Sequence, residues 1–247
     1  MDEHHQSSLN ARSFGAAAAQ YARARPSYPL GAVEWLLPAD ARDVADVGAG
    51  TGLFTRRLVE RGLHVVAVEP LPEMRAQLVS SLPDVEALDG SGEALPLPDA
   101  SCDAVFFAQA WHWVDVARAG PEVARALRPG GALGLLWNVR DESVDWVARL
   151  GRIMHPGSEH EMFSANPTVG PPFQPIERRD FPWTHSINRD TLFDLVASRS
   201  YFIVLSAPER ASVLDQVRDL LDTHPDLVGR EDIEMPYITR CSRTTLA

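Results

Sequence analysis

The residues best suited to do chemistry lie in two short stretches, 44–52 and 65–70. The first reads Val-Ala-Asp-Val-Gly-Ala-Gly-Thr-Gly, a β-branched run that passes into a glycine-rich turn, and the second ends in Glu69 and a proline. Glycine lets a ligand approach the backbone because no Cβ stands in the way. Glu69 follows Gly48 at about the 20-residue separation at which a carboxylate binds a ribose. Together the two stretches predict a nucleoside-binding site.

The elements that must position this site follow an alternating pattern. Short β-type runs alternate with helical stretches, which is typical of parallel strands joined by right-handed crossovers. The predicted strands are 44–47, 64–68, 85–88, 103–108, 132–137, 176–187 and 233–243, and the predicted helices are 53–61, 72–81, 116–127, 189–198 and 208–222. Residues 154–174 are rich in His, Gly, Pro and Ser and are too long for an ordinary connection, which predicts an irregular excursion or lid.

Composition narrows the class of protein. The 247 residues are 45% hydrophobic, enough for a full core in one domain. The formal net charge is −11 and no lysine occurs, so sequence-independent binding of nucleic acid is disfavoured. No apolar run approaches 18 residues and the first eight residues are polar, so we expect a cytoplasmic protein with no membrane span or signal peptide. Cys102 and Cys241 are predicted to be buried thiols.

Four segments in this order and spacing carry a resemblance to a known family. They are Ser13-Phe-Gly with 21–29, the glycine loop, Gly90-Ser-Gly-Glu-Ala-Leu-Pro and Ala108-Gln-Ala-Trp-His-Trp. The chain resembles class I S-adenosylmethionine-dependent methyltransferases of the small-molecule branch called type 11, and within it bacterial proteins related to trans-aconitate methyltransferases. The resemblance implies S-adenosylmethionine as cofactor and S-adenosylhomocysteine as product.

The resemblance also implies the fold and the organisation of the chain. We expect an α/β, Rossmann-like seven-stranded sheet that is mainly parallel, with helices on both faces and the last strand antiparallel. We expect one methyltransferase domain over 1–247. Its parts would be an N-terminal lid (12–35), a cofactor-binding core (40–140), a substrate-capping excursion (150–175) and a C-terminal part of the sheet with its helices (176–247).

The resemblance assigns the cofactor to individual positions. They are Tyr21, Arg25, Asp46, Gly48, Ala49, Gly50, Thr51, Gly52, Glu69, Pro70, Leu71, Ser91, Gly92, Glu93, Gln109 and Ala110. Asp46 and the loop backbone would hold the methionine part, and Glu69 would bind both ribose hydroxyls. Pro70 and Leu71 would pack on the adenine, Gln109 and Ala110 would lie under the sulfonium, and Tyr21 and Arg25 would form a lid over the carboxylate end. Family members often have Asp-Ala where this chain has Ser91 and Gly92, so Ser91 would replace the usual adenine contact with a weaker one.

The glycine loop by itself is compatible with two other interpretations. A dinucleotide site shares the strand, turn, helix and acidic ribose ligand, but its G-x-G-x-x-G pattern requires glycine where this chain has Leu53. A purely structural glycine turn has no need of Glu69. The nucleoside-sulfonium interpretation is therefore favoured over both.

His112 is the candidate catalytic residue, because it follows the fourth predicted strand and a histidine titrates in the useful range. The alternative is a hydrogen-bonded structural residue between Trp111 and Trp113. The two tryptophans are either an apolar wall for the substrate or part of the core. His155, His160 and Glu161 suggest a metal only weakly, because no four-ligand constellation accompanies them, and we expect no metal.

Three hypotheses for function follow. The first is a methyltransferase acting on a small molecule, in secondary metabolism of a bacterium. The second is an enzyme that retains S-adenosylmethionine for a rearrangement or elimination without methyl transfer. The third is an interaction protein that keeps only the fold, against which the intact loop and Glu69 argue. The sequence contains no pattern that specifies an oligomeric state.

Overall fold

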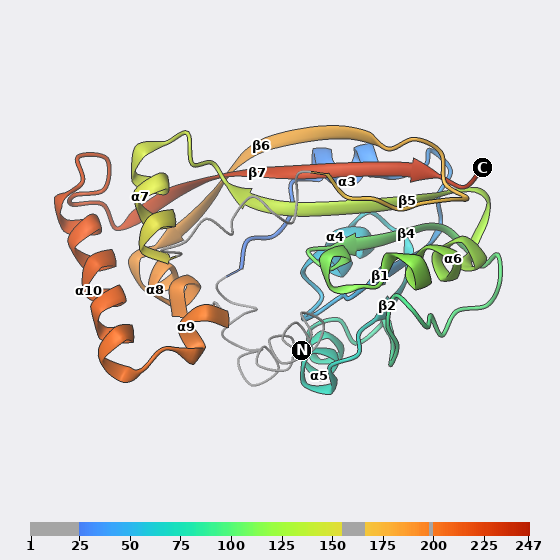
Figure 1. Ribbon diagram of the computed structural model, residues 1–247, viewed down its shortest axis with the longest axis horizontal. Coiled ribbons are helices and arrows are strands. Elements are labelled where there is room, and N and C mark those ends of the chain that lie inside the picture. The colour runs from blue at the N-terminus through green and yellow to red at the C-terminus, as the bar shows by residue number, and fades with distance from the viewer. Residues whose placement is uncertain (1–24, 155–165, 198–199) are drawn as a thin grey trace. The chain divides into compact units, whose positions relative to one another are not determined.

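The computed structural model describes residues 25–154, 166–197 and 200–247 (Figure 1). The chain divides into two compact units. Among the described residues, the sheet unit comprises 27–138, 166–181 and 239–247, and the helical unit comprises 25–26, 139–154, 182–197 and 200–238. The organisation of the chain as one domain stays a prediction.

In the described residues, seven strands form one sheet in the order β3-β2-β1-β4-β5-β7-β6. The strands are β1 (Asp43–Val47), β2 (His64–Val68), β3 (Glu86–Leu88), β4 (Cys102–Ala108), β5 (Leu127–Arg140), β6 (Glu177–Asn188) and β7 (Asp232–Thr245). Strands β3, β2, β1, β4 and β5 pair in parallel. The mixed, mostly parallel sheet with an antiparallel pair at its edge confirms the predicted fold class.

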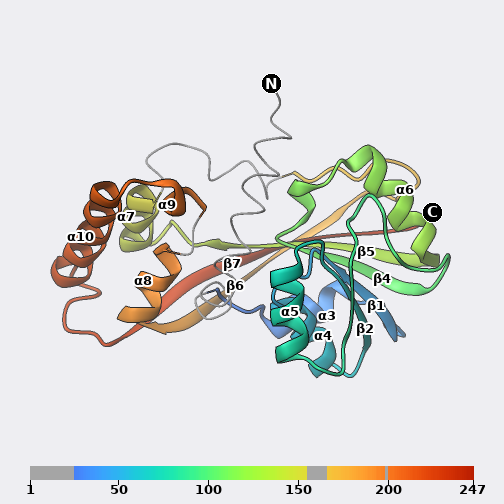
Figure 2. The same ribbon diagram turned by 90° about the horizontal axis from the view of Figure 1, so that it is seen from below.

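Helices cover both faces of the sheet unit because alternate strand residues point to opposite sides. Phe106 packs with α3 (Leu30–Leu36) and α4 (Leu53–Glu60), whereas Phe107 packs with α6 (Val116–Ala126). Ala67 packs with α5 (Pro72–Ser81) on the α4 side. Figure 2 shows α3, α4 and α5 on one side of the strands and α6 on the other.

The helical unit has its own hydrophobic core. It contains α7 (Asp145–Met154), α8 (Arg189–Ala197), α9 (Ser200–Val204) and α10 (Ala207–Thr223), with parts of β6 and β7. Leu150, Leu192, Leu221 and Tyr237 are buried together in this core. No described helix has the length and apolar character that crossing a lipid bilayer requires.

Most predicted elements occur near their predicted bounds, and β2 and α5 have the predicted bounds themselves. Strand β5 starts five residues before its predicted start at 132, because Leu127 already pairs with Cys102. The sequence analysis did not predict α3 or α7. Met154, predicted to begin the irregular excursion, is the last residue of α7; residues 155–165 lie outside the described part, and 166–174 form no helix or named strand.

Candidate functional site

The glycine loop turns back on the end of strand β2. The backbone N–H groups of Gly48 and Ala49 both donate to the Val68 carbonyl, at 2.8 and 3.2 Å. Gly48 has a φ of +68°, and a Cβ on it would lie only 2.6 Å from the Cβ of Ala110. Gly50 also has positive φ, but a Cβ there would meet nothing within 4 Å. The first glycine is thus required by packing, whereas the second faces open space.

Glu69 is fixed by the backbone on both of its oxygens. Gly50 N–H donates to Oε2 at 2.8 Å and Leu71 N–H donates to Oε1 at 2.9 Å, and the side chain is 5% exposed. Burial raises the pKa of Glu69, while these two hydrogen bonds and Arg75 oppose the rise. A carboxylate oxygen accepts two hydrogen bonds, so each oxygen keeps capacity for one more donor. The carboxylate can therefore accept from two adjacent hydroxyl groups.

Asp46 lies fully buried at the end of β1. Thr55 Oγ1 donates to its Oδ2 at 2.6 Å, but Oδ1 has no hydrogen-bond partner among the described residues. Burial raises the pKa of Asp46 to about 7, and the nearby Glu69 adds to the rise. The Thr51 hydroxyl is also buried without a partner among the described residues. A buried polar atom without a hydrogen-bond partner costs free energy unless a ligand or water satisfies it. Both atoms therefore fit contact with a bound polar group, and the carboxylate of Asp46 fits a cationic group.

The segment that follows β4 is held by β5. Gln109 has a φ of +59°, which is uncommon for a residue with a Cβ, and its side-chain amide donates to the Asn138 carbonyl at 3.1 Å. The Asn138 side chain donates to the Ser27 carbonyl at 2.8 Å and accepts from Thr239 Oγ1 at 2.6 Å. Backbone strain of this kind clusters at functional sites. Sequence reasoning missed Asn138, because its partners lie about a hundred residues away in the chain.

His112 and its two neighbours have different surroundings. Trp111 is 3% exposed and packs edge-on against Phe107, with ring centroids 4.7 Å apart. Trp113 is 38% exposed, and its ring centroid lies 4.7 Å from that of His112. The His112 Nδ1 accepts a hydrogen bond from Trp137 Nε1 at 3.2 Å, and burial lowers the pKa of His112 to about 4. Trp111 is thus a core residue, and Trp113 is the tryptophan with an exposed ring.

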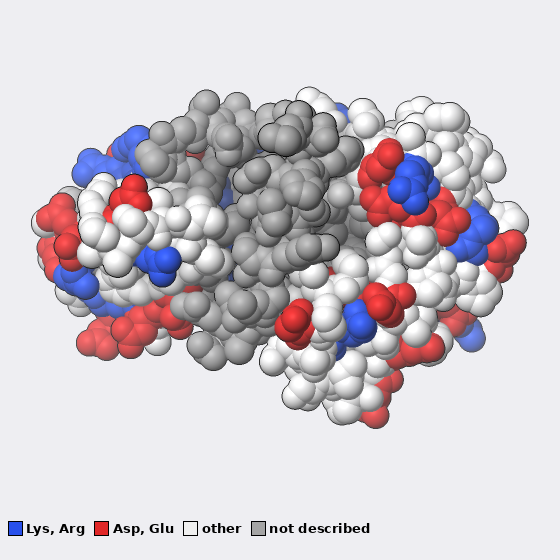
Figure 3. Space-filling view, turned by 60° about the horizontal axis from the view of Figure 1, so that its bottom comes forward, with Lys and Arg blue, Asp and Glu red and all other residues white. Residues whose placement is uncertain are grey.

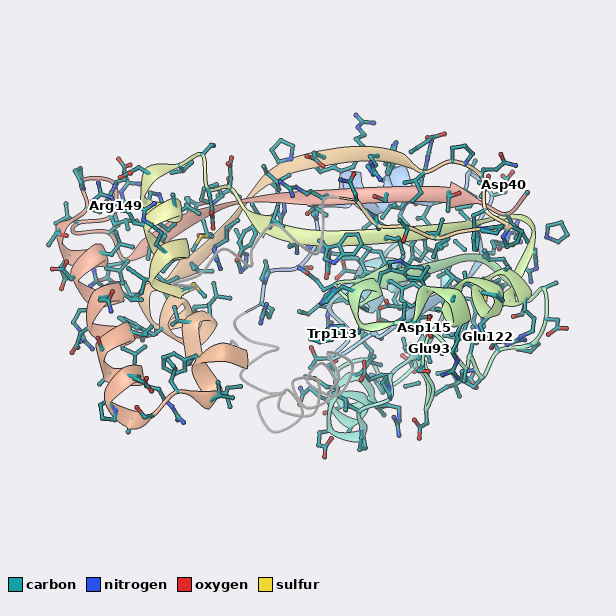
Figure 4. All side chains as sticks on the ribbon, viewed as in Figure 1. Asp40, Glu93, Trp113, Asp115, Glu122 and Arg149 are labelled. Atoms are coloured by element: carbon teal, nitrogen blue, oxygen red, sulfur yellow. The ribbon has the colours of Figure 1, made fainter. Side chains whose placement is uncertain are left out.

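The predicted adenine-binding segment forms a tight turn against β4 and α6. Ser91 and Ala94 pair across the turn, and a Cβ on Gly92 would lie 2.8 Å from Val114. Glu93 Oε1 accepts from the Asp115 backbone N–H at 2.8 Å, at the start of α6. Figure 4 shows Glu93 and Asp115 lying next to each other. Glu93 therefore anchors the turn, and the ligand roles of these residues stay predictions.

The structure thus brings together most of the predicted cofactor residues. Gly48, Glu69 and Ala110 meet at the carboxyl edge of β1, β2 and β4. Pro70 lies next to them but is exposed. Arg25 belongs to the helical unit, and Tyr21 lies outside the described residues.

The predicted absence of a metal site stays a prediction. His155, His160 and Glu161 fall outside the described residues. Within the described ranges, no three His, Cys, Asp or Glu side chains form a group that could hold a metal ion.

The strand order, the glycine turn after β1 and the acid after β2 define a Rossmann-like nucleoside-binding protein. Residues 45–135 match the model of a methyltransferase domain. Over 235 residues the chain is 54% identical to an uncharacterised methyltransferase of Mycobacterium tuberculosis H37Rv, with 95% of this chain and 96% of the relative covered. It is 31% identical over 241 residues to an uncharacterised methyltransferase-like protein of Schizosaccharomyces pombe, with 94% of each chain covered. The chain therefore belongs to the class I S-adenosylmethionine-dependent methyltransferases.

Solved structures agree with this assignment at the level of the fold. A protein of Anaeromyxobacter dehalogenans described as a type II methyltransferase is similar with a TM-score of 0.61 and 22% identity, over 90% of this chain and 97% of that one. A protein of Anabaena variabilis described as a methyltransferase from an antibiotic biosynthesis pathway gives a TM-score of 0.53 and 23% identity, over 85% and 95% of the two chains.

Proposed function

We propose that this protein binds S-adenosylmethionine at the glycine loop and transfers its methyl group to a small-molecule acceptor, releasing S-adenosylhomocysteine. The observation that carries the proposal is the Glu69 carboxylate, which two backbone N–H groups hold in place with one acceptor position left on each oxygen. A ribose offers two adjacent hydroxyl donors to such a carboxylate. Because the carboxylate is fixed before the ligand arrives, little conformational entropy is lost on binding.

The loop and Asp46 support the methionine end of the same ligand. The unpartnered Oδ1 of Asp46 would accept from an ammonium group, and the unpartnered Thr51 hydroxyl would bond to a polar atom of the ligand. The open space above Gly50 leaves room for the ligand to lie on the backbone. Ala110, which packs on Gly48, and Gln109 would then border the reacting end.

When bound, S-adenosylmethionine supplies an electrophilic methyl group on a sulfonium, and its transfer requires alignment more than covalent catalysis. The residues described here would act by holding cofactor and acceptor so that the acceptor atom, the methyl carbon and the sulfur lie in line. Glu69 would fix the ribose, and the segment 109–113 would border the space for the acceptor.

The surface charge supports a small acceptor over a nucleic acid. On the face that Figure 3 shows, arginines are interspersed with Asp and Glu side chains and do not form a separate basic patch in the described residues. Arg125 pairs with Asp99 and Glu122, for example, and Arg128 pairs with Asp43 and Asp103. A nucleic-acid site would need unpaired cations to contact phosphates.

The test is calorimetry of the purified protein with S-adenosylmethionine, S-adenosylhomocysteine and NAD⁺. We expect the two sulfur compounds to bind with micromolar or tighter dissociation constants and NAD⁺ to bind at least about 100-fold more weakly, a difference of about 2.7 kcal/mol. Tight binding of NAD⁺ alone would overturn the cofactor assignment. Release of S-adenosylhomocysteine in the presence of small-molecule acceptors, followed by mass spectrometry, tests the methyl transfer itself.

A further inference from the structure

Asp46 is a fully buried acid, and its surroundings favour its neutral form while no ligand is bound. Its neighbours across the sheet, Ala67 in β2 and Phe106 in β4, cannot carry a charge. Thr55, in the first turn of α4, donates to Oδ2, but Oδ1 has no hydrogen-bond partner among the described residues. A carboxylate that leaves water loses much free energy unless a counter-charge or several hydrogen bonds replace the water. One hydrogen bond does not meet this requirement, so protonation is favoured.

The charged residues of β1 and of the elements packed around it are exposed, have partners elsewhere or lie at the other end of the sheet. They are Glu34 in α3, Arg56, Arg57 and Glu60 in α4, Glu73 and Arg75 in α5, His64 in β2, Asp103 in β4 and Asp43 in β1 itself. Arg57 bonds to Glu60, for example, and Arg75 donates to the Glu69 carbonyl. Among the described residues, the charged group that acts on Asp46 is the carboxylate of Glu69, and it is negative.

Glu69 is better suited than Asp46 to carry a charge. Each of its oxygens accepts a backbone N–H, and Arg75 also favours the charged form. When two carboxyl groups interact, they titrate as a pair, and the one whose oxygens have more donors loses its proton more readily. The charge on Glu69 then adds to the effect of burial, and together they raise the pKa of Asp46 to about 7. In the ligand-free protein, Asp46 therefore holds the proton of this pair.

We propose that cofactor binding expels this proton: the ammonium group of the methionine part replaces it as the partner of the Asp46 carboxylate, and the proton passes to the solvent. The inference rests on the proposed function, and it adds the control of that site by pH. It depends on the positive charge that the cofactor brings to the glycine loop, whichever oxygen of Asp46 lies nearer to that charge. A cation nearby stabilises the ionised form of a buried carboxyl group.

The consequence is a cofactor affinity that rises with pH. The protein without ligand holds one proton more than the complex, so a higher proton concentration favours the ligand-free state. The affinity should increase about tenfold from pH 5 to pH 6 and should level off above about pH 7.5. The ammonium group keeps its own proton over most of this range, because α-amino groups titrate near about 8.

Calorimetry of the full-length protein counts the protons. S-adenosylhomocysteine is titrated in phosphate, PIPES and imidazole at one pH, and the slope of the measured enthalpy against the ionisation enthalpy of the buffer gives the number of protons released. We expect about 0.9 proton per site at pH 6 and about 0.2 at pH 7.5, the protonated fractions for a pKa of about 7. Binding without any proton release at pH 6 would overturn the inference.

Methylthioadenosine is the matched ligand, because it has the nucleoside and the sulfur but lacks the amino acid part. It should bind without releasing a proton, whereas S-adenosylmethionine should release as many protons as S-adenosylhomocysteine. If methylthioadenosine released as many protons as S-adenosylhomocysteine, the ammonium group would not be what expels the proton, and the inference would fail.

Asp46→Asn should abolish the proton release and the pH dependence of affinity, whereas Asp40→Asn, which changes an exposed aspartate before β1, should keep both. Glu69→Gln should move the release to lower pH, because it removes the negative charge that raises the pKa of Asp46. This second variant decides the matter if Asp46→Asn binds too weakly to measure, and a release curve that it leaves unshifted would contradict the inference. A melting curve for each variant verifies that it is folded.

Failure of this inference can be distinguished from failure of the proposed function. Heat of binding that does not depend on the buffer leaves the cofactor site in place and overturns the proton coupling alone. No binding of S-adenosylmethionine or S-adenosylhomocysteine at any pH from 5 to 8 overturns both.

Discussion

The backbone N–H of Gly50 donates to the Glu69 carboxylate at 2.8 Å, and this hydrogen bond joins the glycine loop to the acid that follows the second strand. The two features that the sequence marks as the nucleoside site are therefore one hydrogen-bonded unit. The loop amide holds the carboxylate, and the carboxylate in turn limits the movement of the loop. Changes at either residue should affect cofactor binding through the same contact.

Gly50→Ala should reduce cofactor affinity by at least about tenfold while costing about 1–2 kcal/mol of stability, the usual cost of positive φ for alanine. The added Cβ meets nothing within 4 Å in the protein, so it would project into the open space assigned to the ligand. Gly62→Ala is the matched control, because Gly62 also has positive φ and open surroundings but lies outside the loop. Calorimetry and thermal unfolding measure the two effects, and equal affinity in both variants would contradict the site.

Glu69→Gln should weaken binding of S-adenosylhomocysteine by about tenfold or more, since a hydrogen bond to a charged group contributes about 1.5–3 kcal/mol. Glu69→Ala should weaken it further, because the N–H groups of Gly50 and Leu71 lose their acceptor as well. Glu73→Gln changes an exposed acid in the first turn of α5 and should leave affinity within about twofold. Calorimetry that finds all three variants equal to the wild type would remove Glu69 from the site.

The free energy of unfolding of the ligand-free protein should fall as pH rises from about 4 to about 7, because buried Asp46 keeps its proton in this range. The folded protein holds this proton up to a pKa of about 7, whereas an unfolded aspartate releases it near 3.8. The unfolded state therefore binds fewer protons in this window, and the free energy of unfolding decreases with pH. The raised pKa of Glu69 acts in the same direction.

Asp46→Asn should flatten this pH dependence, because asparagine does not titrate. Urea unfolding at pH 4, 5.5, 7 and 8.5 gives the comparison: the stability of the variant relative to the wild type should increase with pH up to about 7 and then level off. If the free energy of unfolding changes with pH in the same way in the variant and the wild type, Asp46 is already ionised at low pH in the ligand-free protein.

Tyr237→Phe should leave the stability unchanged or raise it by up to about 1 kcal/mol. The ring is 2% exposed in the core of the helical unit, and its hydroxyl has no hydrogen-bond partner among the described residues, so removing the hydroxyl removes an unsatisfied polar group. Tyr237→Ala should instead cost about 3–5 kcal/mol, because it leaves a cavity where the ring packs on Trp183. Denaturant unfolding measures both, and a loss above about 2 kcal/mol in Tyr237→Phe would contradict this account.

The sequence by itself determined the features that depend on local pattern. Strand β2 and helix α5 have the bounds, 64–68 and 72–81, that the alternation of β-type runs and helical stretches predicts. The glycine spacing and Glu69 indicated the nucleoside site because Rossmann-like folds repeat that local geometry. The sequence did not predict helix α7, although Trp146, Val147, Leu150 and Met154 have helical spacing. Gly151, within this helix, disfavours helical structure locally.

Only the tertiary structure decided what distant residues do to one another. The sequence left His112 open between base and structural residue, and no local pattern indicates that the indole of Trp137, 25 residues further along the chain, donates to its Nδ1. Asn138 carries no local signal, yet it links Gln109, Ser27 and Thr239. Hydrogen bonds between strands depend on the register of the sheet, which is fixed by packing across the whole fold, and no short stretch of sequence contains that information.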